Sequence, residues 1–151
     1  MMKKIGLTIA VLCCTLSMMA QKGEKAIGGS MGYATEVDNI GIGWKFQYFI
    51  SDDLRAEANS NYFFNGNHGS MLDFNLNAQY VIDLNSKMAI YPFIGPTFEH
   101  WGNDDDVFGM NLGCGFEYHL PSSVSLFAES KSQLVKDYSK WVCTFGVKYR
   151  F

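Results

Sequence analysis

Residues Trp141–Phe151 read WVCTFGVKYRF, and this stretch decides the fold. Its odd-numbered positions are apolar: Trp141, Cys143, Phe145, Val147, Tyr149 and Phe151. Its even-numbered positions are mostly small or polar, and they include Lys148 and Arg150. Successive side chains of a strand point to opposite faces, so the stretch is predicted to be a β-strand with one apolar and one mostly polar face.

The same alternation recurs along the rest of the chain. It predicts eight strands, over residues 25–34, 40–50, 54–64, 71–82, 88–99, 108–120, 124–134 and 141–151. Short polar segments separate them, and no apolar run after the N-terminal region is long enough for a membrane-spanning helix. We therefore expect an all-β fold, an eight-stranded antiparallel up-and-down barrel.

The fifth predicted strand, residues 88–99, has the weakest pattern. It contains Pro92 and Pro96, which lack the N–H group that a strand ladder needs, so we expect a bulge or a locally broken ladder here. Thr97 and Glu99 are polar and share the odd parity, which is therefore expected to face inward. The other members of this parity are Ala89, Tyr91 and Phe93.

The polar faces indicate which side of the barrel points inward. They are rich in glycine, at Gly28, Gly32, Gly41, Gly43, Gly109, Gly113, Gly115 and Gly146. The interior of an eight-stranded barrel is just wide enough for side chains to fill it, so small residues suit inward positions. A soluble barrel is the alternative, and it would place the apolar faces inward instead.

Charged residues on the polar faces balance in number. Five are positive and five are negative: Lys45, Arg55, Lys131, Lys148, Arg150, Glu57, Asp73, Glu99, Glu117 and Glu129. Buried charges need partners because their desolvation is costly. We expect these ten residues to form a lumen charge network inside a transmembrane β-barrel.

Aromatic residues gather near the ends of the predicted strands. They are Trp44, Tyr62, Phe64, Phe98, Trp101, Trp141, Tyr149 and Phe151. Such positions suit the aromatic girdles that membrane barrels place at both membrane interfaces. The distribution therefore favours the membrane barrel over the soluble one.

Residues 1–20 have the layout of a cleaved secretory signal peptide. A short positive region precedes an apolar region over residues 5–16, and a small residue follows before position 21. The apolar region is shorter than the roughly 18–20 residues that span a bilayer, which argues against a permanent anchor. A lipoprotein modified at Cys13 or Cys14 is an alternative that the preceding residues fit poorly. Residues 21–151 then form one exported barrel domain.

Two cysteines remain after the signal peptide, Cys114 and Cys143. They fall on the sixth and eighth predicted strands, with one strand between them. Neighbouring strands lie about 4.8 Å apart, so the two Cα atoms are expected about 10 Å apart, too far for a disulfide. We expect both residues to be small, lipid-facing side chains.

These features resemble the small OmpA/OmpX-type outer-membrane β-barrel family, in the broad porin-like sense of an outer membrane protein β-barrel domain. The resemblance rests on the signal peptide, the glycine-alternating stretch 109–118, the segment Tyr91-Pro92-Phe93 and the closing strand 145–151. It implies a location in the bacterial outer membrane and contact with outer-membrane lipid or lipopolysaccharide. It also implies a monomer with a polar, plugged interior.

The resemblance further implies insertion by the outer-membrane barrel assembly machinery, which reads the C-terminal aromatic strand. The residues of this assembly signal are Phe145, Val147, Tyr149 and Phe151. With the N-terminus in the periplasm, the turns at 51–53, 83–87 and 121–123 are expected on the periplasmic side. The other four connections are then extracellular and only slightly longer.

The sequence offers few residues for chemistry. His68 and Ser70 are spaced like the His–x–Ser pair of outer-membrane lipid A deacylases, so a lipid A-modifying hydrolase is the main alternative function. The run Asp104–Asp106 lacks the alternating ligand spacing of a calcium loop, so we expect no metal and no cofactor. A net charge of −3 gives no reason to expect nucleic acid.

We interpret the chain as a non-enzymatic outer-membrane barrel that contributes to envelope integrity or surface interaction. Eight strands leave no open aqueous channel, so at most a narrow conductance is expected. A small selective pore is the second alternative.

Overall fold

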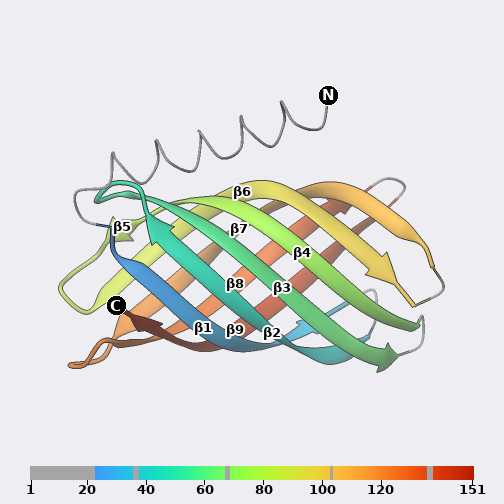
Figure 1. The fold of residues 1–151 in the computed structure, drawn as a ribbon, viewed down its shortest axis with the longest axis horizontal. Coiled ribbons are helices and arrows are strands. Elements are labelled where there is room, and N and C mark those ends of the chain that lie inside the picture. Colours follow the sequence, from blue (N-terminus) through green and yellow to red (C-terminus); the bar gives the residue numbers. More distant parts are fainter. Residues whose placement is uncertain (1–22, 36–37, 67–68, 103, 136–137) are drawn as a thin grey trace, which may run out of the picture.

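The computed structural model describes residues 23–35, 38–66, 69–102, 104–135 and 138–151. Long strands run around a common axis (Figure 1). Their bounds are β1 Lys25–Ala34, β2 Asn39–Phe49, β3 Leu54–Gly66, β4 Gly69–Tyr80, β5 Ile82–Asp83, β6 Met88–Trp101, β7 Asp106–His119, β8 Val124–Val135 and β9 Tyr138–Arg150. Within the described residues, no helix is long and apolar enough to cross a membrane.

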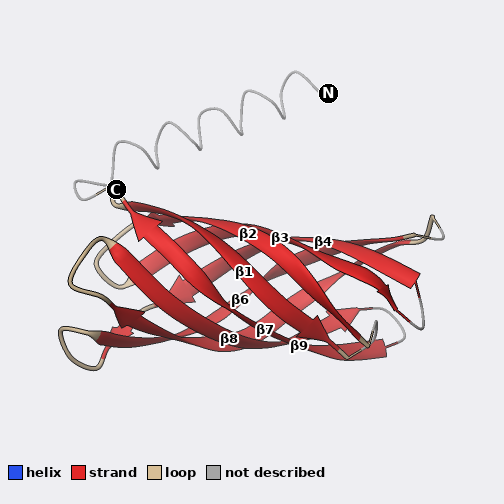
Figure 2. Cartoon of the chain, turned by 90° about the horizontal axis from the view of Figure 1, so that it is seen from below, coloured by secondary structure: helices blue, strands red, loops and turns tan. Residues whose placement is uncertain are grey.

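The strands close into a barrel with antiparallel neighbours throughout (Figure 2). β1 pairs with both β2 and β9, and a pairing between β4 and β6 completes the ring. β5 follows β4 beyond Val81 and pairs with the same neighbour, β6. Counted as one strand with β4, it leaves eight strands in the barrel wall. The predicted eight-stranded up-and-down barrel is confirmed.

Most strand boundaries differ from the prediction by one or two residues, and the largest shift is at the start of the last strand. The fourth strand ends at Tyr80 rather than residue 82, and Ile82–Asp83 form the separate short strand β5. The Val81 amide between them still donates to the Asp53 carbonyl at 2.7 Å, in line with the pairing of β3 and β4. The last strand begins at Tyr138 rather than residue 141. The earlier start brings Lys140 from an expected loop into the barrel wall.

The two prolines of β6 interrupt one of its ladders and leave the other intact. Pairing with β7 is continuous from Met88 to His100. On the other side, no pair with β4 or β5 forms at Gly95–Pro96 or at Tyr91–Pro92 in this fully described stretch, and the register is unchanged across both gaps. The expected local break is thus confirmed, and it occurs without a bulge. The missing proline N–H groups explain both gaps.

Backbones approach closely at the first of these gaps. A Cβ atom on Gly95 would stand 1.7 Å from the Leu76 carbonyl oxygen, a distance that no side chain can occupy. Glycine therefore lets β6 stay against β4 where the ladder has no hydrogen bonds.

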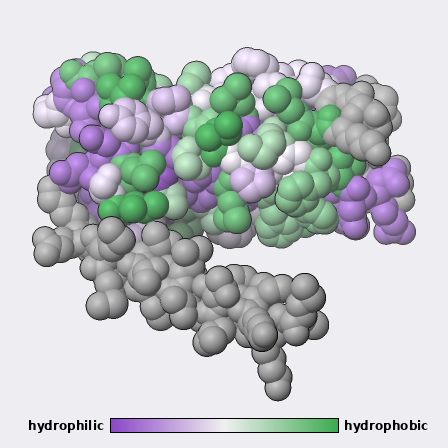
Figure 3. All heavy atoms as spheres, turned by 90° about the horizontal axis from the view of Figure 1, so that it is seen from above, coloured by the Kyte–Doolittle hydropathy of each residue, from purple (hydrophilic) through white to green (hydrophobic). Residues whose placement is uncertain are grey.

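The apolar side chains cover the outside of the barrel. Ile42, Leu112 and Phe145 are 53%, 56% and 64% exposed, and hydrophobic residues spread over the middle of the surface in Figure 3. Polar residues, including Arg55, Asp73 and Lys148, are buried inside. The soluble alternative, with an apolar interior and a polar exterior, is therefore wrong.

The facing expected for β6 and for the cysteines is confirmed. Ala89, Tyr91 and Phe93 are buried in the interior. Cys114 and Cys143 are free and exposed on the outer face, and Ser130 of β8 lies between them in register.

Candidate functional site: the barrel interior

The inward side chains of all eight strands of the wall meet in the barrel interior. The amide of Lys25 donates to the carbonyl of Phe151 at 3.1 Å, so β1 begins and β9 ends at the same end of the barrel. We call this the periplasmic end and the opposite one the extracellular end, following the expected orientation. Between them, the alternating pattern of each strand aims polar groups at the axis.

The middle of the lumen is organised around Lys45. Its Nζ atom lies 3.2 Å from Glu57 Oε2 and also contacts Glu129, and its ammonium sits 3.9 Å from the centre of the Phe127 ring. The Tyr91 hydroxyl donates to Glu129 at 2.8 Å. One cation thus neutralises two carboxylates that come from opposite sides of the barrel.

A second cluster lies nearer the periplasmic end, around Glu117. The carboxylate is 2.8 Å from Arg55 Nη2 and 2.7 Å from Lys148 Nζ. Arg55 also donates from Nε to Gln79 at 2.6 Å and stacks on the Tyr91 ring at 4.6 Å. All of these charged side chains are almost completely buried, so here one carboxylate neutralises two cations.

Two further ion pairs lie toward the extracellular end. Lys131 is 3.6 Å from Asp73, and Lys140 is 2.5 Å from Glu99. Asp73 and Glu99 are direct cross-strand partners on β4 and β6, so their carboxylates need both cations close by. The Lys140 ammonium also lies 5.2 Å from the Trp101 ring.

Amide side chains connect these ionic clusters. Asn59 donates to Glu57 at 2.5 Å and accepts from Asn75 at 2.8 Å. Gln133 donates to Asp73 at 3.2 Å, and Gln47 accepts from Lys148 at 2.8 Å. These hydrogen bonds link the ionic clusters into one network, and such bonds are stronger in a low-dielectric interior than in water.

Two apolar clusters pack against this polar interior. One lies toward the extracellular end and consists of Ala34, Phe63, Met71, Trp101 and Val142, with Val107 against it. The other lies on the periplasmic half and consists of Val81, Ala89, Tyr91 and Phe93, with Phe49 against it. The interior is therefore a packed core that the charges share with two hydrophobic clusters.

Nine of the ten residues proposed from the sequence lie together in the lumen, and Arg150 does not. Arg150 sits at the periplasmic rim, where it is 3.5 Å from the half-exposed Glu24. Lys140 takes its place as the fifth buried cation, with 3% exposure. The sequence reasoning missed Lys140, although it shares the even parity of Lys148 and would appear if the alternation were extended upstream.

The other candidate residues that the structure describes lie apart from one another. His68 lies outside the described residues, and Ser70 lies near the start of β4. His100 is 2.6 Å from Asp106 at the extracellular end. His119 accepts or donates one hydrogen bond with Ser125 at 2.9 Å near the periplasmic end. The described residues contain no group of three or more potential metal ligands.

The residues of the expected assembly signal form one outer stripe. Phe145, Val147, Tyr149 and Phe151 are all exposed on the outer face of β9 and just beyond it. The Tyr149 and Phe151 rings are stacked with centroids 6.4 Å apart. The stripe ends at the periplasmic rim.

The fold is shared with solved bacterial barrels. The N-terminal β-barrel domain of Pseudomonas aeruginosa OprF has 16% identity and a TM-score of 0.74, over 85% of this chain and 98% of that one. Ail, the attachment invasion locus protein of Yersinia pestis, has 15% identity and a TM-score of 0.64, over 87% and 100%. OprG from Pseudomonas aeruginosa has 15% identity and a TM-score of 0.63, over 85% and 96%. No curated protein matches the sequence.

A match to a family model shows the family of the chain, whereas these structures of low sequence identity show only its fold. The model for the outer membrane protein beta-barrel domain matches residues 5–151, nearly the whole sequence. The closed barrel, its apolar exterior and its polar interior agree with that match. The chain belongs to the outer membrane protein β-barrel domain family and is a protein of the bacterial outer membrane.

Proposed function

We propose that the protein is a non-enzymatic, monomeric structural barrel that supports the envelope and presents its hairpins at the cell surface. The filled lumen carries this proposal. Five buried cations lie among five buried carboxylates, and two apolar clusters pack against them. Such an interior suits a rigid membrane element with at most a narrow conductance.

Energetics support a closed lumen. An aqueous path would require the Lys140–Glu99 pair and the Trp101 cluster to separate. Removing one partner of a buried pair costs about 3–5 kcal/mol, and opening a path would separate several groups at once. Thermal fluctuations would therefore open the lumen rarely.

Surface interaction would use the extracellular hairpins, whose sequences are acidic. They contain Glu36, Asp38, Asp104, Asp105, Asp106 and Asp137, against the single cation Lys136. Ail has been solved in complex with the heparin analogue sucrose octasulfate, a polyanion. The acidic hairpins of this chain would repel such a ligand, so a cationic surface or a cation-bridged lipopolysaccharide is the better partner.

The remaining expectations fit the same proposal. The exported domain would follow a signal peptide over residues 1–20. The outer stripe Phe145, Val147, Tyr149 and Phe151 would be read by the barrel assembly machinery. The apolar exterior would contact outer-membrane lipid and lipopolysaccharide.

Single-channel recording in planar bilayers tests the proposal. The refolded wild-type protein is expected to give no steps beyond rare, small ones, because the Lys140–Glu99 pair and the Trp101 cluster close the lumen. Trp101→Ala together with Met71→Ala removes apolar bulk from this cluster and should raise the frequency of steps. Long-lived, frequent openings of the wild-type protein would show a pore instead.

A further inference from the structure

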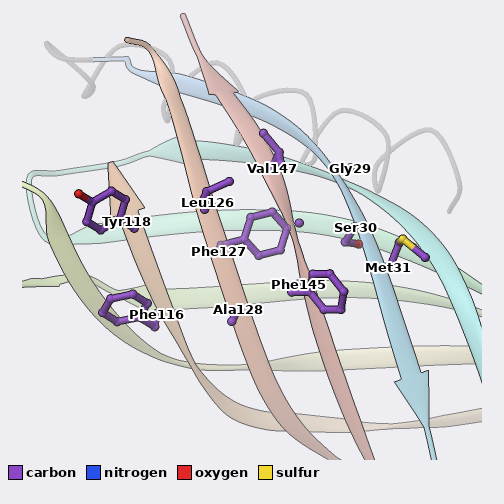
Figure 4. Close-up of a pocket in the computed structure, with 11 residues that line it drawn as sticks. Gly29, Ser30, Met31, Phe116, Tyr118, Leu126, Phe127, Ala128, Phe145 and Val147 are labelled. Atoms are coloured by element: carbon purple, nitrogen blue, oxygen red, sulfur yellow. The ribbon is translucent and has the colours of Figure 1, made fainter. Parts of the chain in front are cut away.

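A groove runs along β8 on the outer face of the barrel. Ala128 and Ser130 form its low floor, while Phe116 of β7 and Phe145 of β9, both in register with Ala128, form its banks. The groove is open to the outside; the part nearer the periplasmic end has a volume of about 580 Å³, and the adjoining part beside Ser130 about 530 Å³. Figure 4 shows Phe116 and Phe145 on either side of Ala128.

The β8 groove lies within the surface that faces lipid. Its walls are apolar, with Met31, Leu126 and Val147 among the residues that line it. Leu126 lies near the start of β8 and Val147 near the end of β9, so this part of the groove belongs to the periplasmic half of the barrel. Because the chain is an outer-membrane protein, the groove is continuous with an interface that lipid already covers.

We propose that the β8 groove holds one acyl chain of a glycerophospholipid from the periplasmic leaflet. An acyl chain in the groove contacts the floor and the aromatic side chains on both sides of it. An acyl chain on a smooth apolar surface contacts the protein on one side only. Each additional carbon contact adds a small dispersion energy, and the contacts add up along the chain. The lipid should therefore stay with the barrel longer than its neighbours do.

Two observations favour lipid over a second copy of the protein. The Ser130 hydroxyl lies 3.7 Å from the sulfur of Cys143 and so has a partner within the chain. In membrane contacts between proteins, serine hydroxyls often bond across the interface instead.

A second groove of about 350 Å³ provides the other observation. It is lined by Trp44, Ala58 and Phe74, and strand order puts β3 and β8 on opposite sides of the barrel. A two-fold dimer would cover one patch of each copy and leave the other groove open. Lipid surrounds the barrel and covers both, and the larger β8 groove offers it more contact than the second groove does.

Native mass spectrometry of the full barrel tests the proposal. The protein is reconstituted in vesicles of phosphatidylethanolamine and phosphatidylglycerol and then extracted in mild detergent. We expect the wild-type protein to retain one phospholipid. Ala128→Phe fills the floor of the groove and should lower the retained fraction about fivefold, through lost dispersion contacts.

Two variants make the test specific. Ala56→Phe adds the same side chain at an outward alanine of β3 that does not line the β8 groove, and it should retain lipid as the wild type does. Gly29→Leu fills the groove from β1, where a new Cβ has no atom closer than 3.9 Å, and it should match Ala128→Phe. Equal retention in all four proteins would overturn the proposal.

The competing occupants give different results. A mass of two protein chains that disappears in Ala128→Phe would show that a second copy fills the groove. Vesicles that also contain lipopolysaccharide separate the two leaflets: preferential retention of lipopolysaccharide would contradict a site in the periplasmic leaflet. Retention of phospholipid from the mixture would support it.

Discussion

The inner and outer faces of the same strands follow different rules. On β7, Glu117 points inward and is held by Arg55 and Lys148, while Leu112 points outward and is exposed on the outer face. An inward residue depends on particular partners, because an unpaired buried charge is costly. An outward residue needs only to be apolar, because lipid adapts to its shape.

The largest expected effect tests the inner face. Glu117→Gln removes the carboxylate that neutralises two cations, and leaves Arg55 and Lys148 buried beside each other. We expect a loss of about 3–5 kcal/mol in the free energy of unfolding. Urea unfolding in lipid vesicles, followed by tryptophan fluorescence, measures it.

The rim supplies the control for this variant. Arg150→Gln breaks the ion pair between Arg150, whose side chain is 26% exposed, and Glu24, whose side chain is 44% exposed. It should lower the free energy of unfolding by less than about 1 kcal/mol, because exposed ion pairs contribute little. Losses of similar size in Glu117→Gln and Arg150→Gln would mean that the inner network does not stabilise the barrel.

The next effect tests the outer face. Leu112→Arg puts a charge among lipid tails and should destabilise the folded barrel by about 2–4 kcal/mol near the bilayer midplane. Asn111→Ser, one residue away on the lumen face, should be milder. Equal effects of the two variants on folding into vesicles would contradict the assigned facing.

The smallest expected effect concerns chemistry at the extracellular end. His68→Ala should leave lipid A unchanged, since the proposed function involves no hydrolysis. Mass spectrometry of lipid A from cells that express either form measures it. A difference in acylation would establish the alternative of a lipid A-modifying hydrolase.

The two faces also differ in what the sequence could predict. Side chains of a strand alternate between its two faces with a period of two residues. The eight strands of the wall, and the polar and apolar face of each, were therefore predicted correctly from the alternation in the sequence. The prolines of β6 located the broken ladder for a chemical reason, their missing N–H groups. The sequence did not indicate whether the register would shift there.

Pairing partners in the lumen could not be predicted. Lys45 and Glu129 are 84 residues apart, and their contact depends on the tilt and stagger of the whole barrel. Lys140 was missed because Ser139, on the outer parity beside it, is polar and hides the alternation at the start of β9. Arg150 has inward parity but lies too close to the end of its strand to be enclosed.

A charge swap between Glu99 and Lys140 tests most directly the claim that matched pairs hold the inner face together. Glu99→Lys and Lys140→Glu each place like charges side by side within the extracellular half of the lumen. Urea unfolding of the two single variants and the double variant measures the interaction. We predict that the double variant recovers most of the stability that either single variant loses. Losses that simply add in the double variant would contradict the account.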